Sequence, residues 1–250
     1  MIDLPPPSTP VTYRSAGAAP ERLSNALYNV QSANQPWSVQ IDPKNDRVRF
    51  ETRPGDRFGS ETGRSRSELQ STAKQSPQGK AVWVTYRVRV SVSPKIASDS
   101  MVIGQFHQTE DKGDLSGYPP FELNLKADGL YVYTATVASP VTSRFYPQRK
   151  IAGPVAFQLD SWHTVAINAR FGWQSDACLR VWLDDKLVVS ATGISMGMND
   201  VVGPYWKYGI YYRPDTADQT VVAEYQNLSV GPVPPVGSAG NTLSGGSTCE

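Results

Sequence analysis

The chain has 250 residues, and its 24 Lys and Arg against 23 Asp and Glu give a net charge of +1 with histidine neutral. This balance argues against a nucleic-acid-binding protein that relies on a broad basic surface, although it leaves room for a local basic cleft. The 20 glycines and 20 prolines argue against a bundle of long helices, and the two cysteines and two histidines fit no zinc-site spacing. No apolar run reaches the roughly 18 to 20 residues that a membrane helix needs.

The two ends of the chain differ in composition from its middle. Residues 1–20 are rich in proline and are expected to form an extended arm, and residues 19–26 offer the one short helical segment. Residues 231–250 are rich in glycine, serine and proline and are expected to form a tail. Cys178 and Cys249 could form one disulfide, which would fold that tail back onto the rest of the chain. Residues 21–230 are predicted to be a single domain.

The middle of the chain alternates between apolar and polar residues, as strands with one buried face do. The clearest run is residues 80–92, in which every second residue is valine or tyrosine. Asp184 and Asp185 lie between two such runs and are typical of a hairpin turn. Many strands and few helices predict an all-β fold, a jelly-roll sandwich of two antiparallel sheets with a concave substrate cleft. The other predicted strands lie at about residues 37–42, 47–52, 64–71, 101–108, 120–126, 129–138, 154–159, 162–171, 179–184, 186–190, 205–213 and 220–230.

Four predicted strands carry more functional groups on one face than solubility requires. If these strands are neighbours, their side chains line one concave surface that suits an acidic sugar. Arginine, with amide donors, can bind a uronate carboxylate and stabilise the negative charge that develops as the C5 proton leaves. A base must take that proton and an acid must protonate the departing O4, and His107 and Tyr211 are both candidates for the base. The four faces are Arg64, Arg66, Glu68 and Gln70; Gln105 and His107; Glu122, Asn124 and Lys126; and Tyr205, Lys207 and Tyr211.

Three motifs on these strands resemble polysaccharide lyases of jelly-roll fold. They are residues 66–69 (RSEL), 105–107 (QFH) and 205–211 (YWKYGIY). Their order and internal spacing are similar to those of the alginate lyases of family 7. Residues 162–165 (WHTV) and 181–184 (VWLD) look closest to the glucuronan lyases and the heparin lyase I group. As a pattern, the resemblance extends over roughly residues 45 to 230.

The resemblance implies a role for each matching residue. Arg66 and Gln105 resemble the groups that neutralise the carboxylate, and His107 resembles a residue that either helps them or acts as base. Tyr211 resembles the catalytic tyrosine, and Lys207 the cation four residues before it. If the C5 hydrogen and O4 lie on the same side of the sugar, Tyr211 can act as base and then as acid. If they lie on opposite sides, His107 would be the base and Tyr211 the acid.

Two departures from the alginate lyase pattern bear on the substrate. Gln70 stands where those enzymes carry a second arginine, and Tyr208 replaces a small alanine. We therefore expect an endo-acting carbon–oxygen lyase that cleaves β-1,4-glucuronan first and alginate or polymannuronate next. A non-catalytic carbohydrate-binding jelly roll is the alternative, and it predicts binding without an unsaturated product. A glycoside hydrolase is disfavoured because no strand carries the paired carboxylates that it needs.

The remaining expectations concern substrate contacts, cofactors and partners. Glu68 could orient Arg66 or touch the substrate itself. No cofactor or catalytic metal is expected, and room is left for a structural calcium ion. The expected partner is an acidic polysaccharide, with no nucleic acid and no membrane, and the enzyme is expected to be a secreted or periplasmic monomer, although the first residues carry no recognisable signal peptide. The predicted substrate-binding residues are Lys207, Arg64, Glu68, Gln70, Asn124, Lys126, Tyr205 and Arg213.

Overall fold

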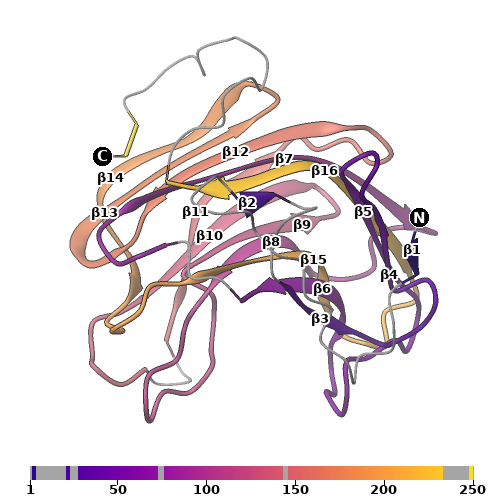
Figure 1. Ribbon diagram of the computed structural model, residues 1–250, viewed down its shortest axis with the longest axis horizontal. Coiled ribbons are helices and arrows are strands. Elements are labelled where there is room, and N and C mark those ends of the chain that lie inside the picture. Colours follow the sequence, from indigo (N-terminus) through magenta and orange to yellow (C-terminus); the bar gives the residue numbers. More distant parts are fainter. Residues whose placement is uncertain are drawn as a thin grey trace.

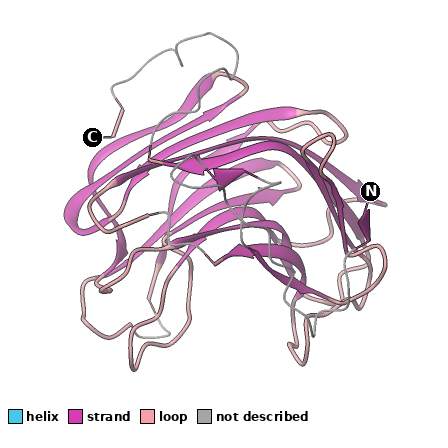
Figure 2. Cartoon of the chain, viewed as in Figure 1, coloured by secondary structure: helices cyan, strands magenta, loops and turns pink. Residues whose placement is uncertain are grey.

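The chain folds into β-strands, and no helix occurs in the ranges that the structure describes (Figure 2). The computed structural model describes residues 2–3, 21–22, 28–72, 76–142, 146–232 and 248–249. Within these ranges no helix is long and apolar enough to cross a membrane. The strands are β1 (Ile2–Asp3), β2 (Glu21–Arg22), β3 (Tyr28–Ser32), β4 (Val39–Asp42), β5 (Arg47–Thr52), β6 (Ser65–Ser71), β7 (Ala81–Ser93), β8 (Ser100–His107), β9 (Phe121–Lys126), β10 (Gly129–Val137), β11 (Gln148–Val155), β12 (His163–Arg170), β13 (Gly172–Leu183), β14 (Lys186–Met198), β15 (Tyr205–Arg213) and β16 (Thr220–Gly231).

The strands form one continuous path that folds over into two layers (Figure 1). The first layer has the order β1-β4-β5-β16-β7-β12-β13-β14, and the second has the order β10-β9-β8-β15-β6-β3. β2 pairs with β16, and β11 pairs with β10. A short parallel pairing of β14 with β10 joins the layers, and the other strand pairs are antiparallel. The predicted all-β jelly-roll sandwich is confirmed.

The core lies between the two layers and is rich in aromatic residues. Tyr86 on β7 and Tyr225 on β16 reach Trp206 and Tyr208 on β15, with ring centroids 5.9 Å and 5.2 Å apart respectively. The Tyr225 hydroxyl donates to the Ile103 carbonyl on β8 and so ties the layers together. Because alternate residues of each strand face this core, the other residues of the second layer face outward onto a concave surface.

Most predicted strands are confirmed, and the differences have local causes. The strand predicted at 154–159 lies instead at 148–155 (β11), where half-exposed residues give no clear alternation. β13 and β14 extend well beyond the predicted 179–184 and 186–190, through segments in which buried, half-buried and exposed residues do not alternate regularly. The five-residue strand β3 was not predicted. Of the helical segment expected at 19–26, residues 21–22 belong to strand β2, and the rest lies outside the described residues.

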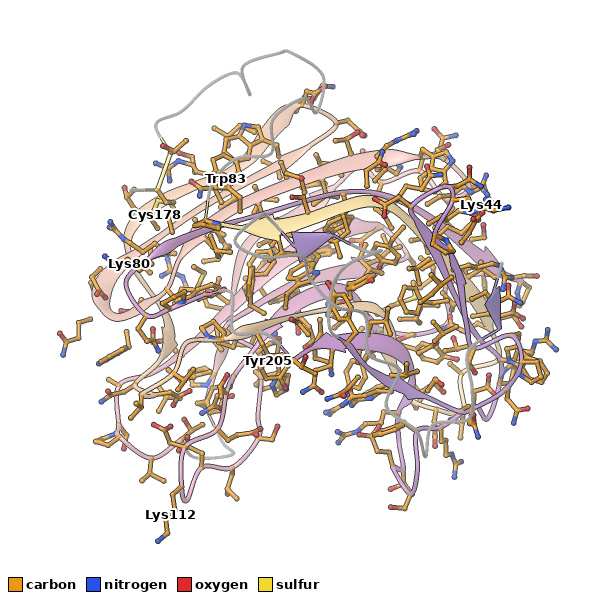
Figure 3. All side chains as sticks on the ribbon, viewed as in Figure 1. Lys44, Lys80, Trp83, Lys112, Cys178 and Tyr205 are labelled. Carbon is orange, nitrogen blue, oxygen red and sulfur yellow. A yellow bond between two sulfur atoms is a disulfide. The ribbon has the colours of Figure 1, made fainter. Side chains whose placement is uncertain are left out.

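One disulfide joins Cys178 on β13 to Cys249, near the end of the predicted tail. The backbone N–H of Cys249 also donates to Asn168 Oδ1 on β12, at 2.6 Å. The disulfide therefore holds this part of the tail against the first layer, at an edge of the molecule far from Tyr205 (Figure 3). Residues 4–20 of the expected arm and 233–247 of the expected tail lie outside the described residues.

Candidate active site

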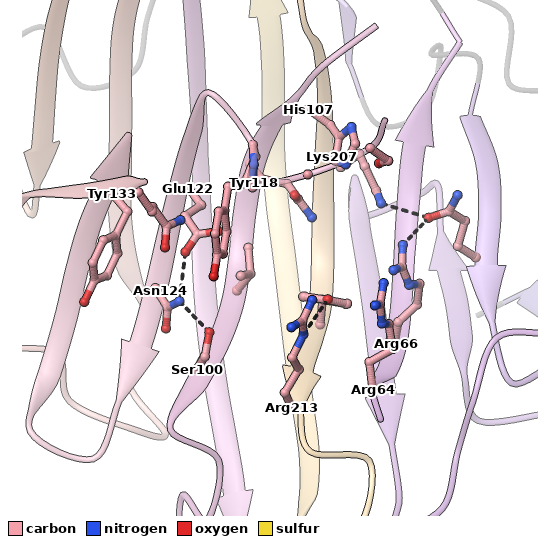
Figure 4. Close-up of a pocket in the computed structure, with 18 of the residues that line it drawn as sticks. Arg64, Arg66, Ser100, His107, Tyr118, Glu122, Asn124, Tyr133, Lys207 and Arg213 are labelled. Carbon is pink, nitrogen blue, oxygen red and sulfur yellow. Dashed lines mark hydrogen bonds between the residues drawn. The ribbon is translucent and has the colours of Figure 1, made fainter. Parts of the chain in front are cut away.

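The outward face of the second layer forms the floor of an open cavity of about 1240 Å³. Loop residues such as Glu61, Glu110 and Tyr118 complete its walls. Except for Glu68, every residue predicted for the site lines this cavity, and Figure 4 shows several of them. These residues are Arg64, Arg66, Gln70, Gln105, His107, Asn124, Lys126, Tyr205, Lys207, Tyr211 and Arg213.

The pairing of the strands explains why these side chains meet. β6, β15, β8 and β9 are neighbours in that order. Lys207 pairs with Gln70 on one side and with Gln105 on the other. Tyr211 pairs with Arg66, and Gln105 pairs with Glu122. Residues directly opposite each other on neighbouring strands have their side chains on the same face. The adjacency that the sequence could only assume is therefore present.

Glu68 lies beneath the floor, where it is 1% exposed, and holds three of the cavity residues. Its Oε1 accepts a hydrogen bond from Gln105 Nε2 at 2.7 Å. Its Oε2 lies 3.1 Å from Lys207 Nζ and 3.3 Å from Arg66 Nη1. Of the two alternatives for Glu68, this geometry fits the orienting role, because its carboxylate is directed at protein groups and does not line the cavity.

Gln31, on the unpredicted strand β3, is a second organising residue. Its Oε1 accepts hydrogen bonds from Arg66 Nη1 and Lys207 Nζ, both at 2.8 Å, and its Nε2 donates to Gln70 Oε1 at 2.7 Å. Arg66 and Lys207 thus contact the same two groups, Gln31 through hydrogen bonds and Glu68 through ion pairs. Lys207 Nζ keeps one N–H for a ligand, and so does the amide of Gln105.

The Tyr211 side chain lies between two guanidinium groups. The Arg66 Cζ is 4.7 Å from the centre of its ring, and Arg213 Nε donates to its hydroxyl oxygen at 3.1 Å. The pairing of β15 with β8 is irregular between Tyr208 and Tyr211, where Gly209 has a φ of +132°. A Cβ on Gly209 would lie 2.3 Å from the Ser67 carbonyl oxygen. The glycine in the YWKYGIY motif is therefore required by the backbone that presents Tyr211.

His107 is uncharged at neutral pH. Burial, together with the positive charges of Lys207 and Arg66, lowers its pKa to about 4. His107 Nδ1 lies 3.1 Å from the Gln108 carbonyl oxygen, which can only accept, so Nδ1 carries the proton and Nε2 holds the free electron pair. The ring also stacks on Tyr205, with centroids 5.5 Å apart.

Lys207 is 3% exposed, and its charge depends on the surrounding groups. Burial lowers the pKa of Lys207, whereas the negative charge of Glu68 raises it, and the net direction is downward. Among the residues that the structure describes, Glu68 is the buried carboxylate that pairs with Lys207, so the pKa of Lys207 is sensitive to any change in Glu68.

The β9 side of the floor is held by hydrogen bonds within the protein. Asn124 Nδ2 donates to Ser100 Oγ at 2.8 Å and to Glu122 Oε1 at 2.9 Å, and Asn124 Oδ1 accepts from the Met101 backbone N–H (Figure 4). Both amide donors of Asn124 are therefore occupied, which argues against the direct substrate contact that was predicted for it. Burial raises the pKa of Glu122, a carboxyl group that also lines the cavity.

Sequence reasoning missed several residues of the cavity. Gln31 lies on a short strand without clear alternation, and Glu61 and Tyr118 lie on loops. Glu61 Oε2 is 3.0 Å from Arg66 Nε. The one available signal was the length of the loops between strands, since long loops often carry functional residues.

Three carboxylates outside the cavity could hold a cation. Oxygen atoms of Asp111, Asp114 and Asp200 all lie within 4.8 Å of one another. Gln108 Nε2 donates to Asp114 at 3.1 Å and to Asp200 at 3.2 Å. Burial, together with the negative charges of Asp114 and Asp111, raises the pKa of Asp200 to about 7. Oxygen ligands of this kind fit a hard cation such as Ca²⁺, which would act here on the loop after β8.

Comparisons with known proteins bear on the family and the fold of this chain. A family model described as polysaccharide lyase matches residues 25–226. The fold is similar to an endo-β-1,4-glucuronan lyase from the fungus Trichoderma reesei, with a TM-score of 0.61, 15% identity, and coverage of 89% of this chain and 94% of that one. It is also similar to an alginate lyase from Pseudomonas aeruginosa, with a TM-score of 0.54, 15% identity, and coverage of 82% and 98%.

A third structure, a family 7 alginate lyase from Zobellia galactanivorans, gives a TM-score of 0.53 at 16% identity and covers 78% of this chain and 81% of that one. At these identities the likeness shows a shared fold. No curated protein matches the sequence. The family match confirms the resemblance drawn from the three motifs and decides for an enzyme over a non-catalytic binding module. Because the matched residues make up most of the chain, this protein belongs to the polysaccharide lyase family.

Proposed function

We propose that this polysaccharide lyase is endo-acting and cleaves a uronic-acid polymer by β-elimination. The observation that carries the proposal is that Arg66, Gln105 and Lys207 gather around Glu68 in the floor of the cavity that Tyr211 also lines, with the Arg66 guanidinium 4.7 Å from the centre of the Tyr211 ring. β-1,4-Glucuronan is the first candidate substrate, and mannuronate-rich alginate is the second. The similarity of the fold to a glucuronan lyase supports this order, as do Gln70 and Tyr208, which depart from the alginate lyase motif.

In the first step, Arg66, Gln105 and Lys207 bind the carboxylate of the sugar that will be cleaved. The C5 hydrogen of a uronate is a poor acid, because its removal places further negative charge next to a carboxylate. Cations and amide donors held in place by Glu68 and Gln31 stabilise that charge without having to reorganise. The two acceptors fix the direction of the donors before the substrate arrives.

In the second step, Tyr211 removes the C5 proton as a phenolate. The electron pair of the C5–H bond forms the C4–C5 double bond, and the C4–O4 bond breaks. The protonated Tyr211 then returns the proton to the departing O4. The guanidinium groups of Arg66 and Arg213 lie beside the ring and the hydroxyl, where they stabilise negative charge on the phenolate oxygen.

His107 is a weaker candidate for the base. A general base works best when its pKa lies near the operating pH, and the pKa of His107 is about 4. The neutral imidazole also adds no positive charge for a carboxylate. We propose that His107 Nε2 accepts a hydrogen bond from a sugar hydroxyl and so helps to place the ring above Tyr211.

The test is a panel of glucuronan, mannuronate-rich and guluronate-rich alginate, heparin, hyaluronan and pectate, followed by the ultraviolet absorbance of the unsaturated product. We expect the highest rate on glucuronan. If no polymer yields the product, the proposed reaction is wrong. A Tyr211→Phe variant that keeps the wild-type rate would leave the reaction standing and remove Tyr211 as the base.

The proposed steps use side chains of this chain alone, so we propose that the enzyme needs no cofactor. It would act as a secreted or periplasmic monomer on an acidic polysaccharide. A structural calcium ion would find its ligands in Asp111, Asp114 and Asp200. Activity that persists after dialysis against a chelator would support the absence of a metal cofactor, and sedimentation of the purified protein tests the monomeric state.

A further inference from the structure

Lys126 and Tyr133 line the cavity on the side opposite Arg66 and Lys207 (Figure 4 labels Tyr133, Arg66 and Lys207). Lys126 ends β9, and Tyr133 lies on β10, the next strand. Adjacent strands are about 4.8 Å apart, so β10 lies roughly 14 Å across the sheet from β15. A sugar bound at Lys126 and Tyr133 is therefore a different sugar from the one that Lys207 and Tyr211 contact.

The polar atoms of this pair suit a carboxylate. Lys126 Nζ donates to the Tyr133 hydroxyl oxygen at 3.1 Å. Since an ammonium group has three donors and the hydroxyl has one, two N–H groups of Lys126 and the proton of Tyr133 remain for a ligand. Among the residues that the structure describes, no carboxylate lies within ion-pair distance of Lys126. A half-buried cation that faces a cavity without an acidic partner is available to an anion.

The aromatic rings beside Lys126 form a rigid support. Tyr131 and Tyr133 stack with centroids 6.0 Å apart, and Lys126 Nζ lies 5.0 Å and 5.3 Å from the two ring centres. A Cβ on Gly153 of β11 would lie 2.7 Å from Tyr131 Cδ1, so the ring packs directly against the backbone there. Tyr131 also donates to Asp128 at 2.6 Å. Little side-chain freedom is left to be lost when a ligand binds.

We propose that Lys126 and Tyr133 form a second carboxylate-binding subsite, which holds a uronate of the same polymer several units from the bond that is cleaved. This inference rests on the proposed function, because it assumes that the cavity binds a polyuronate. It adds that the enzyme recognises at least two separate carboxylates along one chain. Longer oligosaccharides should therefore bind more tightly than those too short to reach from Tyr211 to Lys126.

Lys150 provides a matched control, since its Nζ also lies near the Tyr131 ring, at 5.6 Å, but it is exposed and does not line the cavity. The experiment measures kcat and KM of Lys126→Met, Tyr133→Phe and Lys150→Met on glucuronate oligosaccharides of increasing length. Methionine keeps an apolar stem of similar length and removes the charge. We expect Lys126→Met to raise KM on long chains about tenfold, as the loss of one charge-assisted hydrogen bond implies, with a much smaller change in kcat.

Tyr133→Phe should raise KM less, and Lys150→Met should match the wild type at every length. The increase in KM caused by Lys126→Met should grow with the length of the oligosaccharide, which a purely structural role of Lys126 would not produce. Equal KM values for wild type and Lys126→Met on long chains, at equal melting temperatures, would overturn the subsite.

Calorimetry of the same oligosaccharides with each variant separates this inference from the proposed function. Binding that weakens in Lys126→Met, together with an absence of any unsaturated product from the wild type, would keep the subsite and reject the lyase reaction. If the wild type binds no oligosaccharide of any length, both proposals are wrong.

Discussion

Replacing Glu68 by Gln removes the buried carboxylate that holds Arg66, Gln105 and Lys207, and it should affect both stability and activity. Breaking a buried ion pair by removing one partner costs about 3–5 kcal/mol. Gln31 still accepts from Arg66 and Lys207, at 2.8 Å each, so part of the network survives. We expect a loss of about 2–3 kcal/mol in the free energy of unfolding. For a domain of this size that lowers the melting temperature by roughly 5–10 °C.

The pH dependence of activity reports on Lys207 separately from stability. In the wild type, burial lowers the pKa of Lys207 while the charge of Glu68 raises it. Without that charge the pKa falls further, so Lys207 loses its proton at a lower pH. If protonated Lys207 binds the substrate carboxylate, the alkaline limb of kcat/KM moves to lower pH. At neutral pH kcat/KM should fall about tenfold to hundredfold, which corresponds to about 1.4–2.7 kcal/mol.

Glu61→Gln is the matched control. Glu61 also contacts Arg66, at 3.0 Å from Nε, but its side chain is 28% exposed. Because this pair is more exposed than the pair with Glu68, the variant should lose less stability than Glu68→Gln. Glu61 raises the pKa of Lys207 less than Glu68 does, so the alkaline limb should also move less. Urea unfolding and initial rates of ultraviolet absorbance over a range of pH measure both effects. A Glu68→Gln protein with the wild-type pH profile would refute the positioning role, even if its stability were reduced.

Three further outcomes follow from the geometry. Gly209→Ala should lose about 2 kcal/mol or more of stability in urea unfolding and most of its activity, because the φ of +132° strains any other residue and the new Cβ would lie 2.3 Å from the Ser67 carbonyl oxygen. Burial raises the pKa of Asp200 in the folded state to about 7, so its ionisation costs stability as the pH rises from about 4 to 7. In urea unfolding, the free energy of unfolding of Asp200→Asn should therefore exceed that of the wild type by about 1–2 kcal/mol at pH 8 and by little near pH 4. The pKa of His107, about 4, predicts an acid limb of kcat/KM near that pH, which rate measurements on His107→Asn should show to be absent.

The alternation of residues along single strands was enough to predict which side chains share the cavity. Lys207 and Tyr211 lie four residues apart on β15, and both line the cavity even though the strand is irregular at Gly209. Gln105 and His107 likewise share one face of β8. Which face of a strand is buried is a local property, because side chains alternate with a period of two. The order of the strands is not local, so their adjacency could only be assumed from the sequence, and it is the structure that places β6, β15, β8 and β9 side by side.

The contacts that organise the site depend on residues far apart in the chain. Gln31 is 35 residues from Arg66 and 176 residues from Lys207, and no sequence pattern links them. The role of Asn124 was also not evident from the sequence. Its polar character predicted a substrate contact, whereas its amide donors are occupied by Ser100 and Glu122. A polar residue on a cavity wall can serve the ligand or the protein, and only its hydrogen-bond partners distinguish the two.

The nearly neutral net charge is consistent with a polyanionic substrate because the acidic groups at the site have structural partners. Glu68 and Glu61 neutralise Arg66 and Lys207 from below and from the rim, so these cations can stay buried at fixed positions. Arg64, Lys126 and Arg213 line the same cavity, and within the described ranges none of them forms an ion pair. The paired cations are suited to fixing one carboxylate for reaction. Of the other three, Arg213 donates to the Tyr211 hydroxyl, whereas Arg64 and Lys126 are suited to attracting the rest of the polymer. Since exposed charges are screened over about 10 Å at 0.1 M salt, added salt should raise KM for the polymer more than it lowers kcat.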